Sequence, residues 1–243
     1  MSDTPNTPPP AKAPRQDWPE YFDQLALQCQ NHWLHRYYAG GVVSGDTAMI
    51  NTPLVAMDFE TTGMNAAVDD IVSIGLVPFS LRRIFCRESA HWLVKPRQAL
   101  TEGSVLIHGI THSDINAAPD LEVILEALLT AITGRILVVH YRHIERQFLA
   151  QALLERLGEA ITFPVIDTMA IEHTVLRRRQ GLVDRMLKRS PRGLRLGDCR
   201  ERYGLPHYHA HHALTDALAT AELLQAQIAY HFSEDTPLGE LWL

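Results

Sequence analysis

The spacing of apolar residues changes close to residue 51. Before it, apolar and aromatic side chains of residues 18–38 recur near helical spacing and stop ahead of Gly40 and Gly41, which predicts one or two helices. After it, short apolar runs are separated by short polar turns. This second pattern predicts three early strands, over residues 54–59, 71–79 and 91–94.

From residue 120 onward, helical spacing and apolar strand runs alternate. Helices are expected over residues 120–132, 144–157, 169–178, 196–203 and 212–231. Two further strands are expected over residues 135–140 and 163–167, although Pro164 suits the start or edge of a strand better than its middle. Three adjacent strands followed by this alternation predict an α/β domain with a mixed sheet.

Composition divides the chain into four parts. Residues 1–15 carry five prolines and few apolar side chains, which is typical of a disordered tail. Residues 16–50 are expected to form a helical extension that packs on the main domain, residues 51–232 that domain, and residues 233–243 a C-terminal tail. The 243 residues, of which 46% are hydrophobic, are sufficient for a packed core.

Membrane proteins and disulfide-stabilised secreted proteins do not fit this composition. No apolar stretch approaches the length needed to cross a bilayer, and the Pro- and Thr-rich start lacks the regions of a signal peptide. The cysteines, Cys29, Cys86 and Cys199, are odd in number and widely spaced, which argues against a disulfide framework and a thiolate zinc site. We therefore expect a cytoplasmic protein with reduced thiols and no membrane partner.

Charge is distributed unevenly along the chain. The net charge is −6, but residues 175–202 contain ten basic and three acidic side chains, a local charge of +7, and the remaining 12 basic and 25 acidic residues give −13. Such a concentration suits a polyphosphate backbone, while the acidic remainder would limit indiscriminate attachment. A solvated arginine-rich surface is the alternative. If the segment binds nucleic acid, we expect contacts from its leading arginines, Arg177, Arg178 and Arg179.

Two carboxylates end the apolar run of the first predicted strand. Asp58 and Glu60 are one residue apart, so in a strand both project from the same face while Phe59 turns into the core. Neighbouring like charges need compensation, and Mg²⁺ or Mn²⁺ is the common partner of carboxylates in phosphate chemistry. A strand that runs out into an acidic turn is the alternative.

Four histidines, at His207, His209, His211 and His212, lie where a loop runs into the last predicted helix. His211 lies close to the helix start, and Asp216 lies about one turn into the helix. An imidazole at this place could take a proton from water, because it titrates near neutrality. A solvated loop and a transition-metal site are the alternatives.

The strand predicted over residues 135–140 gives way to a helix near Ile144, so Glu145 falls in the first helical turn. The helix dipole favours a carboxylate there, and the side chain can face the carboxyl end of the sheet. An ordinary first-turn acid is the alternative. Two loops could approach a ligand closely at a glycine, Thr61-Thr62-Gly63 and the segment 107–111.

Together, these segments resemble the DEDDh family of 3′-to-5′ exonucleases, and within it the exonuclease domain of the epsilon proofreading subunit of bacterial DNA polymerase III. The resemblance covers residues 51–231. Residues 58–63 are similar to the family's first motif, residues 107–111 to its substrate loop, and His211 with Asp216 to its third motif of histidine, four residues and aspartate. The three occur in the family's order.

The resemblance implies a ribonuclease-H-like fold, in which a five-stranded mixed sheet is flanked by helices. It also implies two divalent cations, Mg²⁺ or Mn²⁺, of which one would activate water while both stabilise charge at the phosphate. His211 would be the general base. The implied metal ligands are Asp58, Glu60, Glu145 and Asp216. The expected substrate contacts outside the arginine run are Thr61, Thr62, Gly63 and His108.

The expected activity is metal-dependent release of nucleoside monophosphates from the 3′ end of single-stranded DNA. Glu145 stands where the family has an aspartate, and its extra methylene could displace the second ion. The alternatives are therefore a catalytically weak nucleic-acid-binding module and an exonuclease for RNA or short oligoribonucleotides, since the motifs do not evidently read a 2′-hydroxyl. A stable polymerase partner is not expected, because about a dozen residues follow the last predicted helix.

Overall fold

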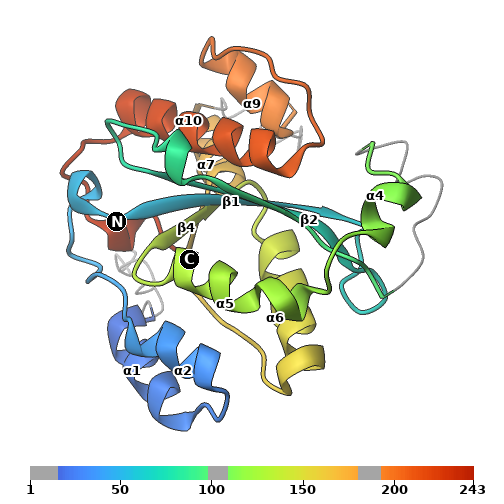
Figure 1. Cartoon of the computed structure of the whole chain (residues 1–243). Coiled ribbons are helices and arrows are strands. Elements are labelled where there is room, and N and C mark those ends of the chain that lie inside the picture. Colours follow the sequence, from blue (N-terminus) through green and yellow to red (C-terminus); the bar gives the residue numbers. More distant parts are fainter. Residues whose placement is uncertain (1–15, 98–108, 180–192) are drawn as a thin grey trace, which may run out of the picture.

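The computed structural model describes residues 16–97, 109–179 and 193–243 (Figure 1). Its centre is a five-stranded mixed sheet with strand order β3-β2-β1-β4-β5. The strands are β1 (Leu54–Thr61), β2 (Ile71–Phe79), β3 (Ala90–Leu93), β4 (Ile136–Val139) and β5 (Val165–Asp167). β2 runs antiparallel to β1 and β3, while β4 runs parallel to β1 and β5. The predicted fold class is confirmed.

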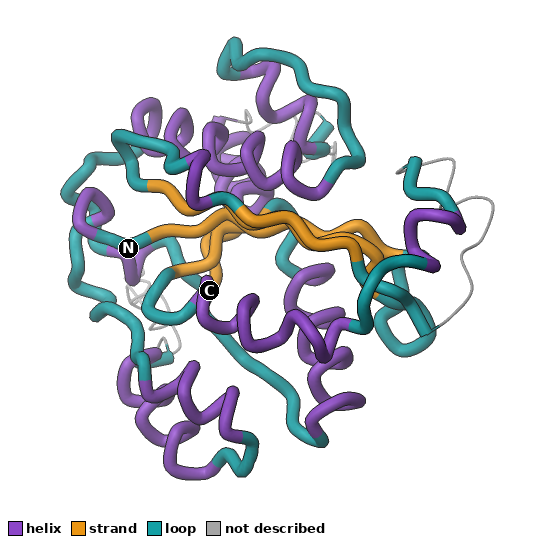
Figure 2. Tube along the Cα trace, viewed as in Figure 1, coloured by secondary structure: helices purple, strands orange, loops and turns teal. Residues whose placement is uncertain are grey.

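Helices cover both faces of this sheet (Figures 1 and 2). One face carries α7 (Thr168–Arg179), α9 (Leu196–Arg202) and α10 (Ala213–His231), and the other carries α5 (Leu121–Ile132) and α6 (His143–Leu157). Because neither face is open to water, all nine residues of β2 are buried. Among the described residues, no helix combines the length and the apolar character needed to cross a membrane.

The strands and helices predicted beyond residue 51 are present, with ends displaced by at most two residues. The short α4 (His112–Asn116) was not predicted, because no element was assigned between the loop 107–111 and the helix expected from residue 120. A capping box begins it: the Thr111 hydroxyl accepts the N–H of Asp114, and the Asp114 carboxylate accepts the N–H of Thr111. Such reciprocal bonds satisfy amide groups that a helix start leaves unpaired.

The amino-terminal helices α1 (Trp18–Gln28) and α2 (His32–Ala39) meet through aromatic rings. Phe22 is fully buried, and its ring centroid lies 5.4 Å from that of Tyr37 and 5.2 Å from that of Tyr38. The Tyr38 hydroxyl accepts a hydrogen bond from the backbone N–H of Thr162, which precedes β5. The helical extension is therefore packed onto the main domain.

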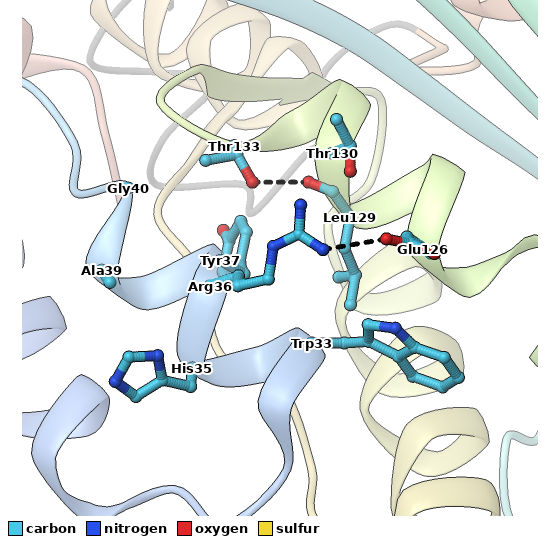
Figure 3. Close-up of a pocket in the computed structure, with 10 residues that line it drawn as sticks. All are labelled: Trp33, His35, Arg36, Tyr37, Ala39, Gly40, Glu126, Leu129, Thr130 and Thr133. Atoms are coloured by element: carbon cyan, nitrogen blue, oxygen red, sulfur yellow. Dashed lines mark hydrogen bonds and ion pairs between the residues drawn. The ribbon is translucent and has the colours of Figure 1, made fainter.

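A cavity of about 430 Å³ lies between α2 and α5 (Figure 3). Trp33 and Arg36 line it from α2, and Leu129 and Thr133 line it from α5 and the residue after it. The Arg36 guanidinium pairs with Glu126 at 2.8 Å, but both side chains are more than half exposed, so the pair adds at most about 1 kcal/mol. The cavity is lined by no residue predicted to act in catalysis.

Residues 233–243 pack against the sheet, which differs from the C-terminal tail expected above. Leu238 is fully buried, and Trp242 forms an antiparallel bridge with Ile166. The backbones of Leu243 and Val165 exchange hydrogen bonds. These contacts pair with β5 at the edge of the sheet, where unpaired strand groups would otherwise face solvent.

We predict that Phe22→Ala lowers the free energy of unfolding by about 3–5 kcal/mol, because it removes a fully buried ring that contacts both tyrosines of α2. The matched control is Leu27→Ala on the same helix, where the side chain is 89% exposed and the change should stay within about 0.5 kcal/mol. Urea unfolding followed by circular dichroism measures both. Equal, small effects would show that α1 does not contribute to the folded core.

Candidate active site

Asp58 and Glu60 project from the same face of β1, and Asp216 from α10 meets them there. Each of the three carboxylates offers one oxygen such that these atoms all lie within 4.8 Å of one another. Glu60 is buried, while Asp58 and Asp216 are partly exposed. In the part of the chain that the structure describes, no other group of three potential metal-ligating side chains comes this close together.

The loop before α10 holds Asp216 in place. His211 has a φ of +68°, in the left-handed region, and its backbone N–H donates to Oδ2 of Asp216 at 2.8 Å. The next residue, His212, caps the helix, because its Nδ1 accepts the N–H of Thr215. A non-glycine residue in this region is strained, and such strain is concentrated at functional sites. The left-handed turn thus directs an amide group at a carboxylate of the cluster.

Burial raises the pKa of each carboxyl group in the cluster, and repulsion by neighbouring carboxylates adds to this at Asp58 and Glu60. Burial is the largest cause for Asp58, whose pKa lies well above its usual range. Repulsion adds to it from Glu145, Asp216 and Glu60, in decreasing order. Burial and the charge of Asp216 raise the pKa of Glu60 to about 8. Burial also raises the pKa of Asp216, although the His211 N–H offsets part of this effect. Without a cation, full ionisation of the cluster is unfavourable.

Glu145 lies in the first turn of α6 with only 2% of its surface exposed. Its Oε2 is buried and, within the described residues, has no hydrogen-bond partner. Burial is the main reason that its pKa lies well above the usual range. Its carboxylate does not belong to the set of oxygens within 4.8 Å. The structure therefore brings three of the four predicted metal ligands together and places Glu145 near enough to repel Asp58.

Asp167, at the end of β5, holds the turn that leads into α6. Its Oδ1 accepts the N–H of Tyr141, and its Oδ2 accepts both the N–H and the guanidinium of Arg142. Tyr141 has a φ of +88°, so these bonds stabilise a strained turn. Asp167 also accepts the N–H groups of Met169 and Ala170 at the start of α7. Its carboxylate is saturated by these contacts, which set the position of the helix that carries Glu145.

The donor set of the cluster fits a hard divalent cation. The available ligand atoms of Asp58, Glu60 and Asp216 are carboxylate oxygens, which Mg²⁺ and Mn²⁺ prefer. The raised pKa values of Asp58 and Glu60 indicate negative charge that the surrounding protein does not compensate. The unpartnered Oε2 of Glu145 is a further buried oxygen beside them. A bound cation would compensate this negative charge and could give the unpartnered oxygen a partner.

A cavity of about 220 Å³ opens beside Glu60. Its lining includes Ser73, His91, Leu93, Ile110, His211 and His212. Nε2 of His91 and the Ser73 hydroxyl are hydrogen-bonded at 2.8 Å, and the His91 ring lies 4.8 Å from that of His212. Burial, followed by the effect of His212, lowers the pKa of His91. The cavity thus joins carboxylate, imidazole and apolar surfaces, a combination that suits a ligand with both polar and apolar parts.

Thr61, Thr62 and Gly63 shape the loop that follows β1. The Thr61 hydroxyl donates to the Gly63 carbonyl at 2.6 Å, and the Thr62 hydroxyl donates to Oδ1 of Asp69 at 3.3 Å and accepts the N–H of Asp70. A Cβ on Gly63 would lie 2.5 Å from the Asp69 carboxylate oxygens. These contacts therefore fix the conformation of the loop that follows the two carboxylates of β1. Contact between them and a substrate stays a prediction.

The arginine run predicted to bind phosphates ends α7. Arg177 and Arg178 are exposed there. The side chain of Arg179 and the whole of His108 lie outside the described residues. Their role in substrate binding stays a prediction.

Two basic residues of the same segment have structural roles. Arg200 is 3% exposed and pairs with Glu222 at 2.7 Å. Arg202 pairs with Glu172, itself 2% exposed, at 2.8 Å. The local positive charge counted from the sequence is thus partly neutralised inside the fold, and the phosphate-binding hypothesis depends on the remaining basic residues.

Reasoning from sequence missed Ser73 and His91. Ser73 lies directly opposite Glu60 in the β1–β2 register and is the one hydroxyl residue of an otherwise apolar strand. That position was a usable signal, because a hydroxyl in a strand buried on both faces needs a partner. His91 gave no such signal, since only the pairing of β2 with β3 brings its ring to Ser73.

Comparison with known proteins agrees with this geometry. A family model described as "Exonuclease" (RNase_T) matches residues 55–224. The DNA polymerase III subunit epsilon of Treponema pallidum is 30% identical over 183 residues, covering 74% of this chain and 78% of that protein. The PolC-type DNA polymerase III of Thermotoga petrophila is 29% identical over 181 residues, again 74% of this chain. The match spans only 12% of the length of that polymerase.

Solved nucleases share the fold. Cell-death related nuclease 4 (CRN-4) superimposes with a TM-score of 0.63 at 21% identity, covering 74% of this chain and 64% of that one. The nuclease domain of 3′hExo, a DEDDh family member solved with bound rAMP, gives a TM-score of 0.59 at 15% identity, covering 74% and 92%. At these identities the likeness concerns the fold alone.

The family model covers more than half of the chain, and its matched range contains Asp58, Glu60 and Asp216. The epsilon relative is 30% identical over 183 residues, which cover most of its own length. The five-stranded mixed sheet and its flanking helices are those of the ribonuclease-H-like nucleases. The chain therefore belongs to the DEDD family of 3′-to-5′ exonucleases.

Proposed function

We propose that this chain is a metal-dependent exonuclease that releases nucleoside monophosphates from the 3′ end of single-stranded DNA. The observation that carries the proposal is the group of Asp58, Glu60 and Asp216, with ligand oxygens within 4.8 Å of one another. The cavity beside Glu60, lined by His211, gives a substrate a place next to these carboxylates.

Each predicted residue has a role in this mechanism. Asp58, Glu60 and Asp216 would hold two divalent cations, Mg²⁺ or Mn²⁺, and Glu145 at the start of α6 would be the fourth ligand. Such ions lower the pKa of bound water and stabilise charge on a phosphate. His211 is exposed and lines the cavity, so its imidazole can take a proton from water and return it to solvent. The sugar and base of the terminal nucleotide would lie in the cavity beside His91 and Ile110.

DNA is the preferred substrate in this proposal because the matched relatives include DNA polymerase III subunits. RNA is the second candidate, favoured by the DEDDh nuclease domain solved with rAMP. The exposed Arg177 and Arg178 at the end of α7 would contact the strand backbone, together with Arg179. We propose a nuclease without a stable polymerase partner.

A catalytically weak nucleic-acid-binding module is the remaining candidate, and one observation favours it. Glu145 stays outside the set of ligand oxygens that the other three carboxylates form. If Glu145 cannot share an ion with Asp58, the second ion is bound poorly and the step slows. Substitutions at these positions distinguish the candidates.

We predict that Asp58→Asn abolishes stepwise shortening of a 5′-labelled single-stranded oligonucleotide, with a loss of more than about 100-fold in kcat with either Mg²⁺ or Mn²⁺. The amide keeps the size of the side chain and removes the charge that a cation needs. Asp46→Asn, an exposed carboxylate in the loop before β1, is the control and should be unchanged. Wild-type protein that shortens no oligonucleotide with either ion would refute the proposed activity.

Glu145→Gln should lower kcat by about tenfold or more at saturating Mn²⁺ without lowering the melting temperature. Gln has the same length but cannot be an anionic ligand, and its neutral amide removes the unfavourable burial of a carboxylate. Glu145→Asp tests whether a shorter carboxylate can still bind the ion, and this variant should retain more activity than Glu145→Gln. Steady-state kinetics and thermal melts measure both properties. Wild-type kinetics for Glu145→Gln would show that Glu145 is not a ligand.

Metal-free protein should lose stability as the pH rises from about 4.5 to 8. The pKa of Glu60 is raised from 4.5 to about 8 in the folded state, so over this range the folded state binds more protons than the unfolded state. The stabilisation from protonated Glu60 is fully present below pH 4.5 and is lost as the pH passes through 8. Mn²⁺ should restore the melting temperature at pH 8 by several degrees, and Glu60→Gln should flatten the slope. A rising slope would contradict the buried, repelled state of Glu60.

A further inference from the structure

Gly75 of β2 lies against the backbone at the start of α10. A Cβ built on Gly75 would lie 2.3 Å from the carbonyl carbon and oxygen of Ala213 and 2.4 Å from the amide nitrogen of Leu214. These are backbone atoms of the first turn of α10, so no side-chain rotation can relieve the contact. Ordinary van der Waals contact of a Cβ begins near 3.4 Å, so any side chain would push that turn away by about 1 Å.

Space, rather than backbone conformation, explains the glycine. The φ of Gly75 is not in the left-handed region, so an L residue could adopt it. Glycine within a strand weakens the strand, because it has no side chain to pack and loses more entropy on folding. Gly75 is the one glycine among the nine residues of β2. The cost of this glycine to the strand therefore indicates that the missing side chain is needed for the contact with α10.

The position of Gly75 connects it to the carboxylate cluster. In the register of β1 and β2, Gly75 is the partner of Asp58. The helix turn that rests on Gly75 begins at Ala213, which is fully buried, and Asp216 lies in the same turn. The closeness of β2 and α10 at this point therefore sets how far Asp216 reaches toward Asp58 and Glu60.

We infer that Gly75 is a positioning residue of the active site, whose lack of a side chain lets the first turn of α10 rest on β2 and brings Asp216 to Asp58 and Glu60. The inference depends on the proposed function, since it concerns the same cation site. Cation ligation tolerates only small displacements, and Mg²⁺ in particular requires near-ideal octahedral geometry. A shift of about 1 Å at the helix start is large on that scale.

The test compares Gly75→Ala with a variant that weakens the same helix without moving its first turn. Ile228 lies near the other end of α10 and is 2% exposed, so Ile228→Ala is the matched control. Calorimetric titration with Mn²⁺ should show at least about tenfold weaker binding for Gly75→Ala and unchanged binding for Ile228→Ala, although both lower the melting temperature.

Hydrogen exchange of metal-free protein gives a second readout. The N–H of His211 is bonded to Asp216, so its exchange should accelerate in Gly75→Ala and stay slow in Ile228→Ala. Asp216→Glu added to Gly75→Ala should recover part of the Mn²⁺ affinity, because the longer side chain compensates for a displaced helix. In an otherwise wild-type protein, Asp216→Glu should weaken binding.

The outcomes separate the inference from the function it depends on. If the wild-type protein neither binds Mn²⁺ nor shortens an oligonucleotide, the proposed function fails and the inference fails with it. If the wild-type protein does both and Gly75→Ala binds Mn²⁺ equally well, only the inference fails. Should Gly75→Ala not fold, Ala213→Val adds volume at a fully buried position of the same helix turn, and wild-type Mn²⁺ affinity in that variant would overturn the inference.

Discussion

Burial opposes the charged forms of Asp58, Glu60 and Asp216, and repulsion by neighbouring carboxylates adds to this at Asp58 and Glu60, so the rest of the fold must hold the three together. Two of them lie on β1, which is paired with β2 on one side and β4 on the other. The third lies on α10, whose first turn rests against β2 at Gly75. The sheet and this helix thus hold an unfavourable arrangement in place, and a bound cation would turn the repulsion into ligation.

The buried charges toward the other end of α10 show the contrast. Glu172 accepts hydrogen bonds from Arg202, Tyr203 and Gln227, and its pKa is lowered because these bonds outweigh burial. Each charge in that network has a partner, so the network ties α7, α9 and α10 together. The fold is therefore able to compensate buried carboxylates with its own residues. Among the described residues, such compensation is present between these helices and is missing at the carboxylates of β1.

Periodicity was sufficient to predict the sheet, the flanking helices and the common face of Asp58 and Glu60, because each depends on local spacing. Asp216 was found through its spacing from His211 in a motif. Gly75 and His91 were not found, since their importance comes from the approach of β2 to α10 and to β3, which no local pattern encodes. Tertiary contact also explains why residues 233–243 pack on β5, since a short apolar segment gains order only when an edge is available to it.

The place of Glu145 bears on whether a glutamate can replace an aspartate here. Among the neighbouring charges that raise the pKa of Asp58, Glu145 has a larger effect than Asp216 or Glu60. Its carboxylate is therefore near enough to repel Asp58, although it lies outside the group that Asp58 forms with the other two. Asp167 fixes the start of α6 through Tyr141 and Arg142, so the helix holds the longer side chain at one depth. Asp58 is thus repelled by Glu145 as well as by Asp216 and Glu60, and a cation held by Asp58 would offset these charges.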